Sequence, residues 1–449
     1  MKKRTFLKTS SAVLTGSLLS PLMAYPYNEP RKNWAGNLTY STDNLYQPKT
    51  VKQVQEMVKK HDKLRALGTR HSFNRIADST QNQLSLADFG QAMAIDKETQ
   101  TVTVDAGIRY GQLARYLQQE GFALHNLASL PHISVAGACA TATHGSGDQN
   151  GNLATAVAGL ELVTADGDMV TMTREHNEEQ LRGAVVGLGG LGVVTKVTLD
   201  IEPTYEVRQD LYQHLPLAML KDHFEEIMSR GYSVSLFTDW KTDRINQVWV
   251  KSRIEQDNLD WQAEPELFGA TLATRDLHPI IEISAENCTQ QMGVPGPWHE
   301  RLPHFRMDFT PSSGEELQAE YFVPREHAVD AILAVQALHE QISPHLFISE
   351  VRSIAADDYW MSPCYQQNSV TIHFTWKPDW PSVRKVLPKI EAALTPYAVR
   401  PHWGKLFTMA PAQLQSSYDR LDDFKKLLQE YDPKGKFRNA FLAENLYNS

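Results

Sequence analysis

Cysteine is scarce in this chain. Three cysteines, Cys139, Cys288 and Cys364, are spread over 449 residues. They form no C-x-x-C pair and no even-numbered set, so the sequence predicts no disulfide framework. The H-E-x-x-H spacing of zinc proteases and the usual cysteine–histidine ligand spacings are missing as well, and we therefore expect no bound metal.

Long apolar runs and an excess of positive charge are also lacking. No stretch of the sequence approaches the roughly 20 apolar residues of a membrane-spanning helix, so we expect no stable membrane span. The formal net charge of -9 argues against nucleic acid as a partner, because phosphate binding needs a basic face. The length indicates a globular protein of about two domains, which we expect to be a monomer.

The N-terminus has the layout of an export signal. A basic start is followed by a weakly apolar run from Ala12 to Leu19, and we predict that residues 1–24 are a signal peptide. The segment KRTFLK, Lys3 to Lys8, is similar to a twin-arginine signal with lysine in the first arginine position. We therefore expect a periplasmic or extracellular protein. The alternative is an exposed basic tail followed by a short helix.

The first part of the remaining chain mixes short strands, helices and glycine-rich turns. Valines between Thr50 and Lys60 recur on one helical face, and Tyr110–Gly121 also has a helical pattern closed by glycine. Residues 101–107 alternate as a strand does, and two alternating runs around Asp166-Gly167 predict a hairpin. We therefore interpret residues 30–205 as one α+β domain.

The second part of the chain differs in composition. Residues 206–405 are richer in aromatics and prolines, with a helical pattern over Glu326–Ile342 and strand patterns over 346–354 and 369–376. This predicts a second domain built on a sheet. Residues 406–449 are too few to form a hydrophobic core of their own, and we expect them to pack back on the first domain. The predicted fold class is therefore α+β.

Two glycine-rich segments are candidates for binding phosphate. Gly187, Gly189 and Gly192 match G-x-G-x-x-G, but they lead into an alternating strand, whereas a dinucleotide fingerprint must open a helix. We reject that reading. The small-residue run from Ser134 to Gly147 is a better candidate, because small side chains let backbone N–H groups face a pyrophosphate as an anion nest rather than a helix cap. The alternative is a tightly packed turn.

Polar side chains cluster in three segments of the second part. Glu350 and Arg352 are two apart on a strand and share a face, as do His373 and Thr375. Lys405 follows a glycine. Each alone is most simply a surface ion pair, a packed histidine or a solvated lysine. Together they suit a pocket for a multiply hydroxylated substrate, in which a histidine or lysine takes a proton from an alcohol.

These motifs resemble one family of flavoenzymes. In order along the chain from Asn33 to Leu442, the sequence is similar to the vanillyl-alcohol-oxidase type of FAD enzyme, and within it to the alditol (xylitol) oxidases, which are related to sugar-lactone oxidases. The segments that carry the resemblance are NWAGNLTY, GTRHSFN, ASLPHISVAGACATATHGSG, GGLGVVTKVTL and DPKGKFRNAFL.

The resemblance implies an FAD domain, of the PCMH type, that is split around a sheet-based substrate cap. His71 matches the histidine that carries covalent FAD, and Arg70 departs from the glycine that many relatives have there. The second covalent attachment of some relatives is not assigned to Cys139. The residues implied to bind FAD are His71, Ala66, Leu67, Gly68, Thr69, Arg70, Ser72, Ser129, Ser134, Gly137, Ala138, Cys139, Ala140, His144, Gly145 and Val194.

The resemblance also implies the reaction. A terminal CH–OH of a sugar alcohol would be oxidised to the aldose while O2 is reduced to H2O2. Ser129, preceded by the small Ala128, would lie at the flavin, and the catalytic wall would comprise Glu350, Arg352, His373, Thr375 and Lys405. Whether His373 or Lys405 is the base stays open. The alternatives are an oxidase or dehydrogenase of L-gulono- or D-arabinono-1,4-lactone, and an inactive exported sugar-binding protein.

Overall fold

The computed structural model describes residues 30–254, 262–308 and 315–448. The predicted signal peptide, residues 1–24, lies outside the described residues. The rest of the chain, from residue 31 onward, forms one compact unit. In the ranges that the structure describes, no helix is both long enough and apolar enough to span a bilayer.

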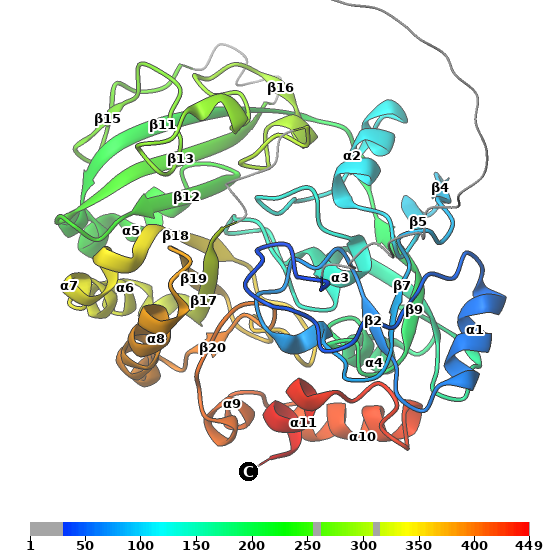
Figure 1. The fold of residues 1–449 in the computed structure, drawn as a ribbon. Coiled ribbons are helices and arrows are strands. Elements are labelled where there is room, and N and C mark those ends of the chain that lie inside the picture. Colours follow the sequence, from blue (N-terminus) through cyan, green and yellow to red (C-terminus); the bar gives the residue numbers. More distant parts are fainter. Residues whose placement is uncertain (1–29, 255–261, 309–314, 449) are drawn as a thin grey trace, which may run out of the picture. The chain divides into compact units, whose positions relative to one another are not determined.

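A five-stranded antiparallel sheet forms the centre of the first part of the chain (Figure 1). The predicted hairpin is confirmed: β7 pairs with β8 across a turn in which Gly167 has a φ of 82°, a value that favours glycine. In spatial order the strands are β4 (Met93–Asp96), β5 (Thr101–Asp105), β9 (Val193–Asp200), β7 (Val157–Val163) and β8 (Met169–Thr173).

Helices and two small sheets, β1-β3-β2 and β10-β6, surround this centre. Helix α1 (Val51–Lys60) begins at Thr50, whose hydroxyl oxygen accepts a hydrogen bond from the N–H of Gln53. It buries Val54 and Val58, as the spacing predicts. The remaining elements here are β1 (Leu45–Tyr46), β2 (Arg65–Leu67), β3 (Gln83–Ser85), β6 (Phe122–Ala123), β10 (Glu202–Pro203), α2 (Tyr110–Gln119), α3 (Val135–Cys139) and α4 (Glu178–Ala184).

The second part is built on one ten-stranded antiparallel sheet, called the cap sheet here (Figure 1). Its order is β14-β15-β11-β13-β12-β18-β19-β17-β20, and β16 pairs with β11. The bounds are β11 (Glu206–Pro216), β12 (Ser233–Thr238), β13 (Arg244–Ile254), β14 (Glu266–Leu267), β15 (Ala270–Leu272), β16 (Gly296–Pro297), β17 (Leu317–Pro324), β18 (Leu346–Ile354), β19 (Ser369–Trp376) and β20 (Arg400–Pro401).

The two faces of the cap sheet differ in character. Apolar side chains such as Val351, Ile372 and Phe374 pack with three helices into one core, as the two-residue period of a strand allows. These helices are α5 (Leu220–Met228), α6 (Ala328–Gln336) and α8 (Trp380–Leu394). The alternate residues face the other way and carry the polar groups of the site.

The helix predicted over Glu326–Ile342 is not continuous, so that prediction is wrong in its extent. α6 ends at Gln336, and α7 (His339–Ile342) begins after Leu338. The N–H of Leu338 bonds to the carbonyl of Val335, which is one residue closer than in an α-helix. This tighter turn breaks the helical ladder although the sequence offers neither proline nor glycine there.

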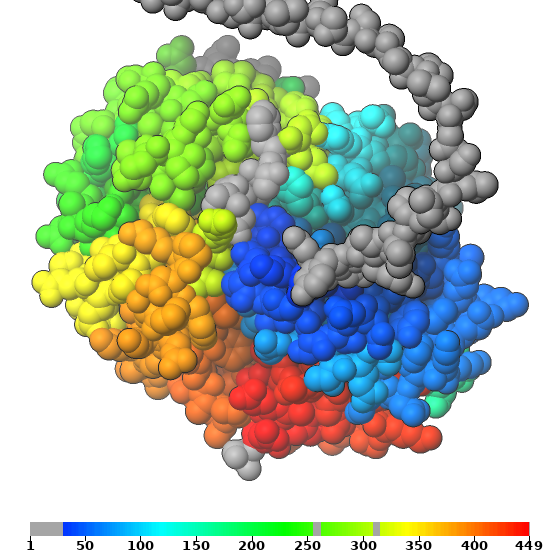
Figure 2. Space-filling view, viewed as in Figure 1, coloured from blue at the N-terminus to red at the C-terminus, as the bar shows by residue number. Residues whose placement is uncertain are grey.

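The C-terminal helices contact the first part of the chain. They are α9 (Pro411–Ser416), α10 (Leu421–Tyr431) and α11 (Ala440–Tyr447), and α10 and α11 share a hydrophobic core with β7 and α4. In Figure 2 the red C-terminal residues adjoin the blue N-terminal ones. Buried Arg65 donates hydrogen bonds to the carbonyls of Leu188, Gly189, Ile76 and Phe437. The domain boundaries at residues 205 and 405 remain predictions.

Candidate active site

One large cavity, of about 880 Å³, lies where the polar face of the cap sheet meets the first part of the chain. Its volume falls within the range of about 300–1,000 Å³ that is usual for ligand and cofactor sites. The cavity brings together most of the residues predicted from the sequence: Ala66, Leu67, Gly68, Thr69, Arg70, His71, Ser72, Ser129, Ser134, Gly137, Ala138, Ala140, His144, Val194, Glu350, Arg352, His373, Thr375 and Lys405.

The turn after β2 presents backbone donors to this cavity. Within the described part of the chain, no acceptor pairs with the peptide N–H groups of residues 69–72. Close packing brings this turn against α3, since a Cβ on Gly68 or on Gly137 would lie within 2.8 Å of Ser134 Oγ. Unpaired N–H groups beside small residues are what a pyrophosphate needs, so these residues fit the diphosphate of FAD.

His71 lies in this turn with its ring fixed on two sides. The Thr69 hydroxyl is 2.9 Å from His71 Nδ1, and the indole of Trp34 stacks on the imidazole with ring centroids 5.3 Å apart. Burial, assisted by His132 and Lys405, lowers the pKa of His71 to about 3. The imidazole is therefore neutral near neutral pH and keeps a lone pair on one ring nitrogen.

Arg70 adopts the left-handed conformation, with a φ of 66°. Outside glycine this conformation costs roughly 1 kcal/mol, which explains why a glycine would suit the position. Its carbonyl accepts a hydrogen bond from Trp34 N–H at 2.8 Å, and its Nη1 donates to the Lys32 carbonyl at 3.2 Å. Arg70 thus ties the turn to the segment that carries the stacking tryptophan.

The run from Ser134 to Gly147 differs from the predicted nest. Its first residues form a short helix, α3, for which Ser134 is the N-cap, so the expectation of a nest rather than a helix cap is wrong for these residues. Small residues in sequence do not distinguish the two conformations. Cys139 and Gly145, expected to bind FAD, do not line the cavity: the Cys139 thiol is buried in the core, 3.4 Å from Tyr110 Oη.

The cap sheet supplies the polar wall. On its cavity face, Glu350 on β18 pairs in register with His373 on β19, which pairs in turn with Glu320 on β17. Arg352, two residues beyond Glu350, places Nη2 2.6 Å from Glu320 Oε1 and Nε 3.6 Å from Glu350 Oε1. The guanidinium therefore lies between two carboxylates. Burial alone would raise the pKa of Glu350, but Arg352 and His304 outweigh it and lower that pKa.

Glu320 is a member of this wall that sequence reasoning missed. Its carboxylate contacts Arg352, His144 Nε2 at 3.1 Å and His373 Nδ1 at 3.4 Å. Burial would raise the pKa of Glu320, yet Arg352 and the histidines hold it well below its usual range. The alternation in LQAEYFVP, which places Gln318 and Glu320 on one face, was the signal that could have found it.

Lys405 reaches the wall from the loop after β20. Its ammonium donates to Gln318 Oε1 and lies 5.0 Å from the centre of the Phe73 ring. Burial lowers the pKa of Lys405 to about 8, with Glu320 opposing the shift. Burial also lowers the pKa of His373, whose Nε2 is 3.2 Å from the Thr375 hydroxyl. The wall thus holds a neutral imidazole beside a lysine that titrates in the physiological range.

Three potential metal ligands meet at the edge of the wall. Atoms of His144, Glu320 and His402 lie within 4.8 Å of one another, and all three residues are buried. A cation there would face the Arg352 guanidinium, which already bonds the Glu320 oxygen nearest to His144. Because that positive charge repels a metal ion, the cluster is better described as a histidine–carboxylate network.

Comparisons with known proteins identify the family. A model described as an FAD binding domain matches residues 42–173, and one described as D-arabinono-1,4-lactone oxidase matches residues 311–445. An alditol oxidase from Streptomyces sp. (strain IKD472 / FERM P-14339) is 48% identical over 417 residues, covering 92% of this chain and 98% of that protein. The chain belongs to the alditol oxidase family of FAD-linked oxidases. The family predicted from sequence motifs is confirmed.

More distant relatives are named as lactone oxidases or lactone dehydrogenases. L-gulonolactone oxidase of Mus musculus is 25% identical over 441 residues, covering 93% of this chain and 98% of that protein. L-gulono-1,4-lactone dehydrogenase of Mycobacterium tuberculosis (strain ATCC 25618 / H37Rv) is 26% identical over 430 residues, covering 92% and 98%. A solved cholesterol oxidase from B. sterolicum has a TM-score of 0.75 at 16% identity, covering 95% of this chain and all of that chain. The predicted two-domain α+β fold is thereby confirmed.

Proposed function

We propose that the protein is an FAD-dependent alditol oxidase, which oxidises the terminal CH–OH of a sugar alcohol to the aldose and reduces O2 to hydrogen peroxide. The observation that carries this proposal is the polar wall on the cap sheet, where carboxylate, guanidinium, imidazole, hydroxyl and ammonium groups face one cavity. A substrate with a hydroxyl on every carbon can pair with such a wall. The 48% identity to an alditol oxidase supports the same assignment.

One side of the cavity suits the cofactor, and the other side suits the substrate. FAD, when bound, would supply the redox chemistry of the reaction, as acceptor of a hydride from carbon and donor of two electrons to O2. The turn at residues 69–72, α3 and Val194 line the part suited to the cofactor. Ser129 and Ala128 also line the cavity, and the small side chain of Ala128 would let O2 approach the flavin.

Different residues of the wall bind the substrate and transfer the proton. Glu350, as a carboxylate, accepts hydrogen bonds from the C2 or C3 hydroxyl, and Arg352 donates to the C1 oxygen. His373 is the better placed base of the two candidates, because Glu320 beside Nδ1 favours the tautomer whose Nε2 can take the proton. Lys405, as an ammonium, then stabilises the alkoxide that develops at C1.

We further propose that FAD is covalently bound through His71. The low pKa of this imidazole supports the assignment, since a neutral ring nitrogen can form the bond. Acid-denatured protein should retain its yellow colour in the pellet. His71→Ala protein should release all of its flavin on the same treatment, and flavin that stays bound to His71→Ala protein would refute the linkage.

Substrate turnover tests the reaction. We expect purified protein to release hydrogen peroxide with xylitol or sorbitol, and to act poorly on L-gulono- or D-arabinono-1,4-lactone. The lactone names of the distant relatives make these lactones the alternative substrates. Preferred turnover of a lactone would overturn the alditol assignment. Replacing O2 by a dye acceptor would reveal a dehydrogenase, and a protein that binds sugar alcohols without turnover would be the inactive alternative.

We also propose that the protein is exported, with residues 1–24 as its signal. The basic start and apolar run of the sequence support this proposal. Expression of the full chain in a bacterial host should give periplasmic protein whose N-terminus begins near residue 25. Export that stops when Arg4 is replaced by lysine would indicate the twin-arginine route, and full-length protein in the cytoplasm would refute the proposal.

A further inference from the structure

A lysine is buried in the cap sheet just behind the polar wall. Lys251 on β13 is 1% exposed and does not line the cavity. Its ammonium donates to the carbonyl oxygens of Leu302 and Pro303, the latter at 3.1 Å, and to Nδ1 of His304 at 3.1 Å. An ammonium has three N–H groups and no lone pair, so all three donors are used. None of the substrate or cofactor contacts described above accounts for this buried charge, which is costly to bury.

Lys251 determines where His304 carries its proton. Since an ammonium only donates, His304 Nδ1 must be an acceptor, and the neutral imidazole then carries its hydrogen on Nε2. Nε2 lies 2.7 Å from Glu350 Oε1 and therefore donates to it. Burial lowers the pKa of His304 to about 4, and the charge of Lys251 adds to this shift, so the ring is neutral near neutral pH.

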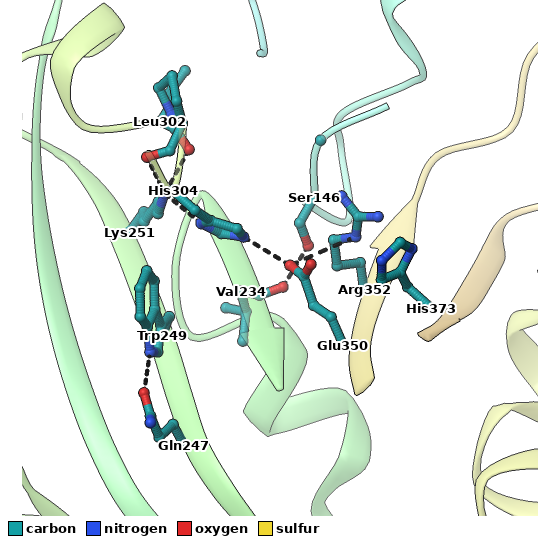
Figure 3. A network of polar contacts seen from close by, with 12 residues as sticks. Ser146, Val234, Gln247, Trp249, Lys251, Leu302, His304, Glu350, Arg352 and His373 are labelled. Carbon is teal, nitrogen blue, oxygen red and sulfur yellow. Dashed lines mark hydrogen bonds and ion pairs between the residues drawn. The ribbon is translucent and has the colours of Figure 1, made fainter. Parts of the chain in front are cut away.

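Two aromatic rings pack against His304, and a guanidinium lies on the other side of Glu350. The rings of Trp249 and Phe237 stand edge-on to the His304 ring at 5.1 and 5.5 Å, which limits rotation of the imidazole. Figure 3 shows Glu350 between His304 and Arg352. Both of these neighbours approach Oε1, while Oε2 of Glu350 has no hydrogen-bonding partner among the described residues. One carboxylate oxygen is therefore anchored, and the other is left for a ligand in the cavity.

We propose that Lys251 is a positioning residue that sets the tautomer of His304 and, through it, the orientation of the Glu350 carboxylate toward the substrate hydroxyl groups. The proposal rests on the proposed function in so far as it assigns a polyol to Glu350. Without the ammonium, the His304 proton can move to Nδ1, and the Nε2 lone pair then faces a carboxylate oxygen. That pairing is repulsive, so Glu350 turns away and recognition of the hydroxyl groups is lost.

A purely structural role for Lys251 makes a different prediction. Lys251 also anchors the loop at residues 302–304 through two carbonyls, and in that case loss of the anchor alone would shift His304. Thr289 provides a matched control, because its buried hydroxyl donates to the same Pro303 carbonyl at 2.7 Å without touching the imidazole. Thr289→Val removes one loop anchor and leaves the donor to Nδ1 in place.

The kinetic experiment compares Lys251→Met with Thr289→Val. Burial lowers the pKa of Lys251 to about 7, with Glu350 opposing, so assays belong at about pH 6, where the ammonium predominates. For Lys251→Met we expect kcat/KM for xylitol to fall about 10- to 100-fold, the range typical of lost partners behind a site. Its preference for xylitol over a 2-deoxy analogue should fall by a similar factor, while Thr289→Val should stay within about twofold of wild type. Equal losses in both variants would overturn the proposal.

A spectroscopic measurement tests the same idea without substrate. Nitrogen-15 spectra of histidine-labelled holoenzyme, recorded at about pH 6 where the Lys251 ammonium predominates, report the tautomer, and His304→Gln identifies the signal. We expect wild type to show the Nε2–H form and Lys251→Met to show a mixture; an Nδ1–H signal in wild type would refute the proposal even if Lys251→Met does not fold. Wild type that oxidises no polyol yet shows the Nε2–H form would instead refute the alditol function and leave the positioning role standing.

Discussion

The pH dependence of kcat/KM distinguishes the two candidates for the catalytic base. Burial places the pKa of Lys405 at about 8, well below the usual value for a lysine. Burial also lowers the pKa of His373, so its imidazole is already neutral at pH 7. If His373 takes the proton and Lys405 acts as an ammonium, activity requires the protonated form of Lys405, which is lost as pH rises.

The magnitude follows from the titration of one group. With a pKa of about 8, the protonated fraction of Lys405 falls from about 0.9 at pH 7 to about 0.1 at pH 9. The titration of Lys405 alone should therefore lower kcat/KM for a sugar alcohol about tenfold over this interval, and loss of the Lys251 ammonium, whose pKa is about 7, should add to the fall. If Lys405 were the base, its neutral form would be required, and the titration of Lys405 would raise kcat/KM by the same factor. The two mechanisms thus differ in the sign of the change.

The assay is steady-state hydrogen peroxide release at low substrate concentration, where kcat/KM reports the free enzyme. Lys405→Met should lower the rate and remove the titration centred near pH 8. Glu320→Gln should move it to lower pH, because Glu320 is the charged group that most raises the pKa of Lys405. A descending limb with a midpoint near 7 that survives Lys405→Met would belong to Lys251. A rise between about pH 7 and pH 9 would refute the assignment of His373 as base.

Four further predictions follow from individual contacts. Glu350→Gln should lower kcat/KM for xylitol about 10- to 100-fold, because the carboxylate bond to a hydroxyl becomes neutral; unchanged turnover would contradict its role. Gly137→Val should lower the flavin content of purified protein, since even the Cβ would come within 2.7 Å of Ser134 Oγ. Asn74→Ala should lower kcat/KM with flavin content unchanged, as it removes hydrogen bonds to the carbonyls of Trp403 and Lys405. Arg65→Met should destabilise the fold by about 1–3 kcal/mol for each carbonyl left unpaired, seen as a lower unfolding temperature, because four carbonyls lose their donor.

Sequence reasoning succeeded where one local pattern carried the information. The hairpin around Gly167 and the burial of Val54 and Val58 follow from periodicity and turn chemistry, which depend on neighbouring residues alone. It overestimated the helix before Ile342, because the break at Leu338 is a change of backbone hydrogen bonding with no side-chain signal. Short small-residue runs such as α3 are ambiguous for the same reason.

The sequence alone predicted only some of the residues of the site. Glu350, Arg352 and His373 came from strand patterns combined with a family resemblance, and all three line the cavity. Their partner Glu320 escaped notice because a single glutamate on an alternating strand is ordinary until register places it opposite His373. His304 lies in an irregular loop, and only the fold brings it to Glu350, 46 residues away along the chain.

Hydrogen bonds between segments that are far apart in the sequence hold the cofactor side and the substrate side of the cavity together. The turn that carries His71 continues into Phe73, whose N–H bonds the carbonyl of Gly404 at 2.8 Å, and into Asn74, whose amide bonds the carbonyls of Trp403 and Lys405. Two segments more than 300 residues apart therefore share one set of hydrogen bonds to backbone carbonyls. Because hydride transfer depends on the distance between cofactor and substrate, these bonds would help to hold the turn of His71 at a fixed distance from Lys405, and neither motif reveals them alone.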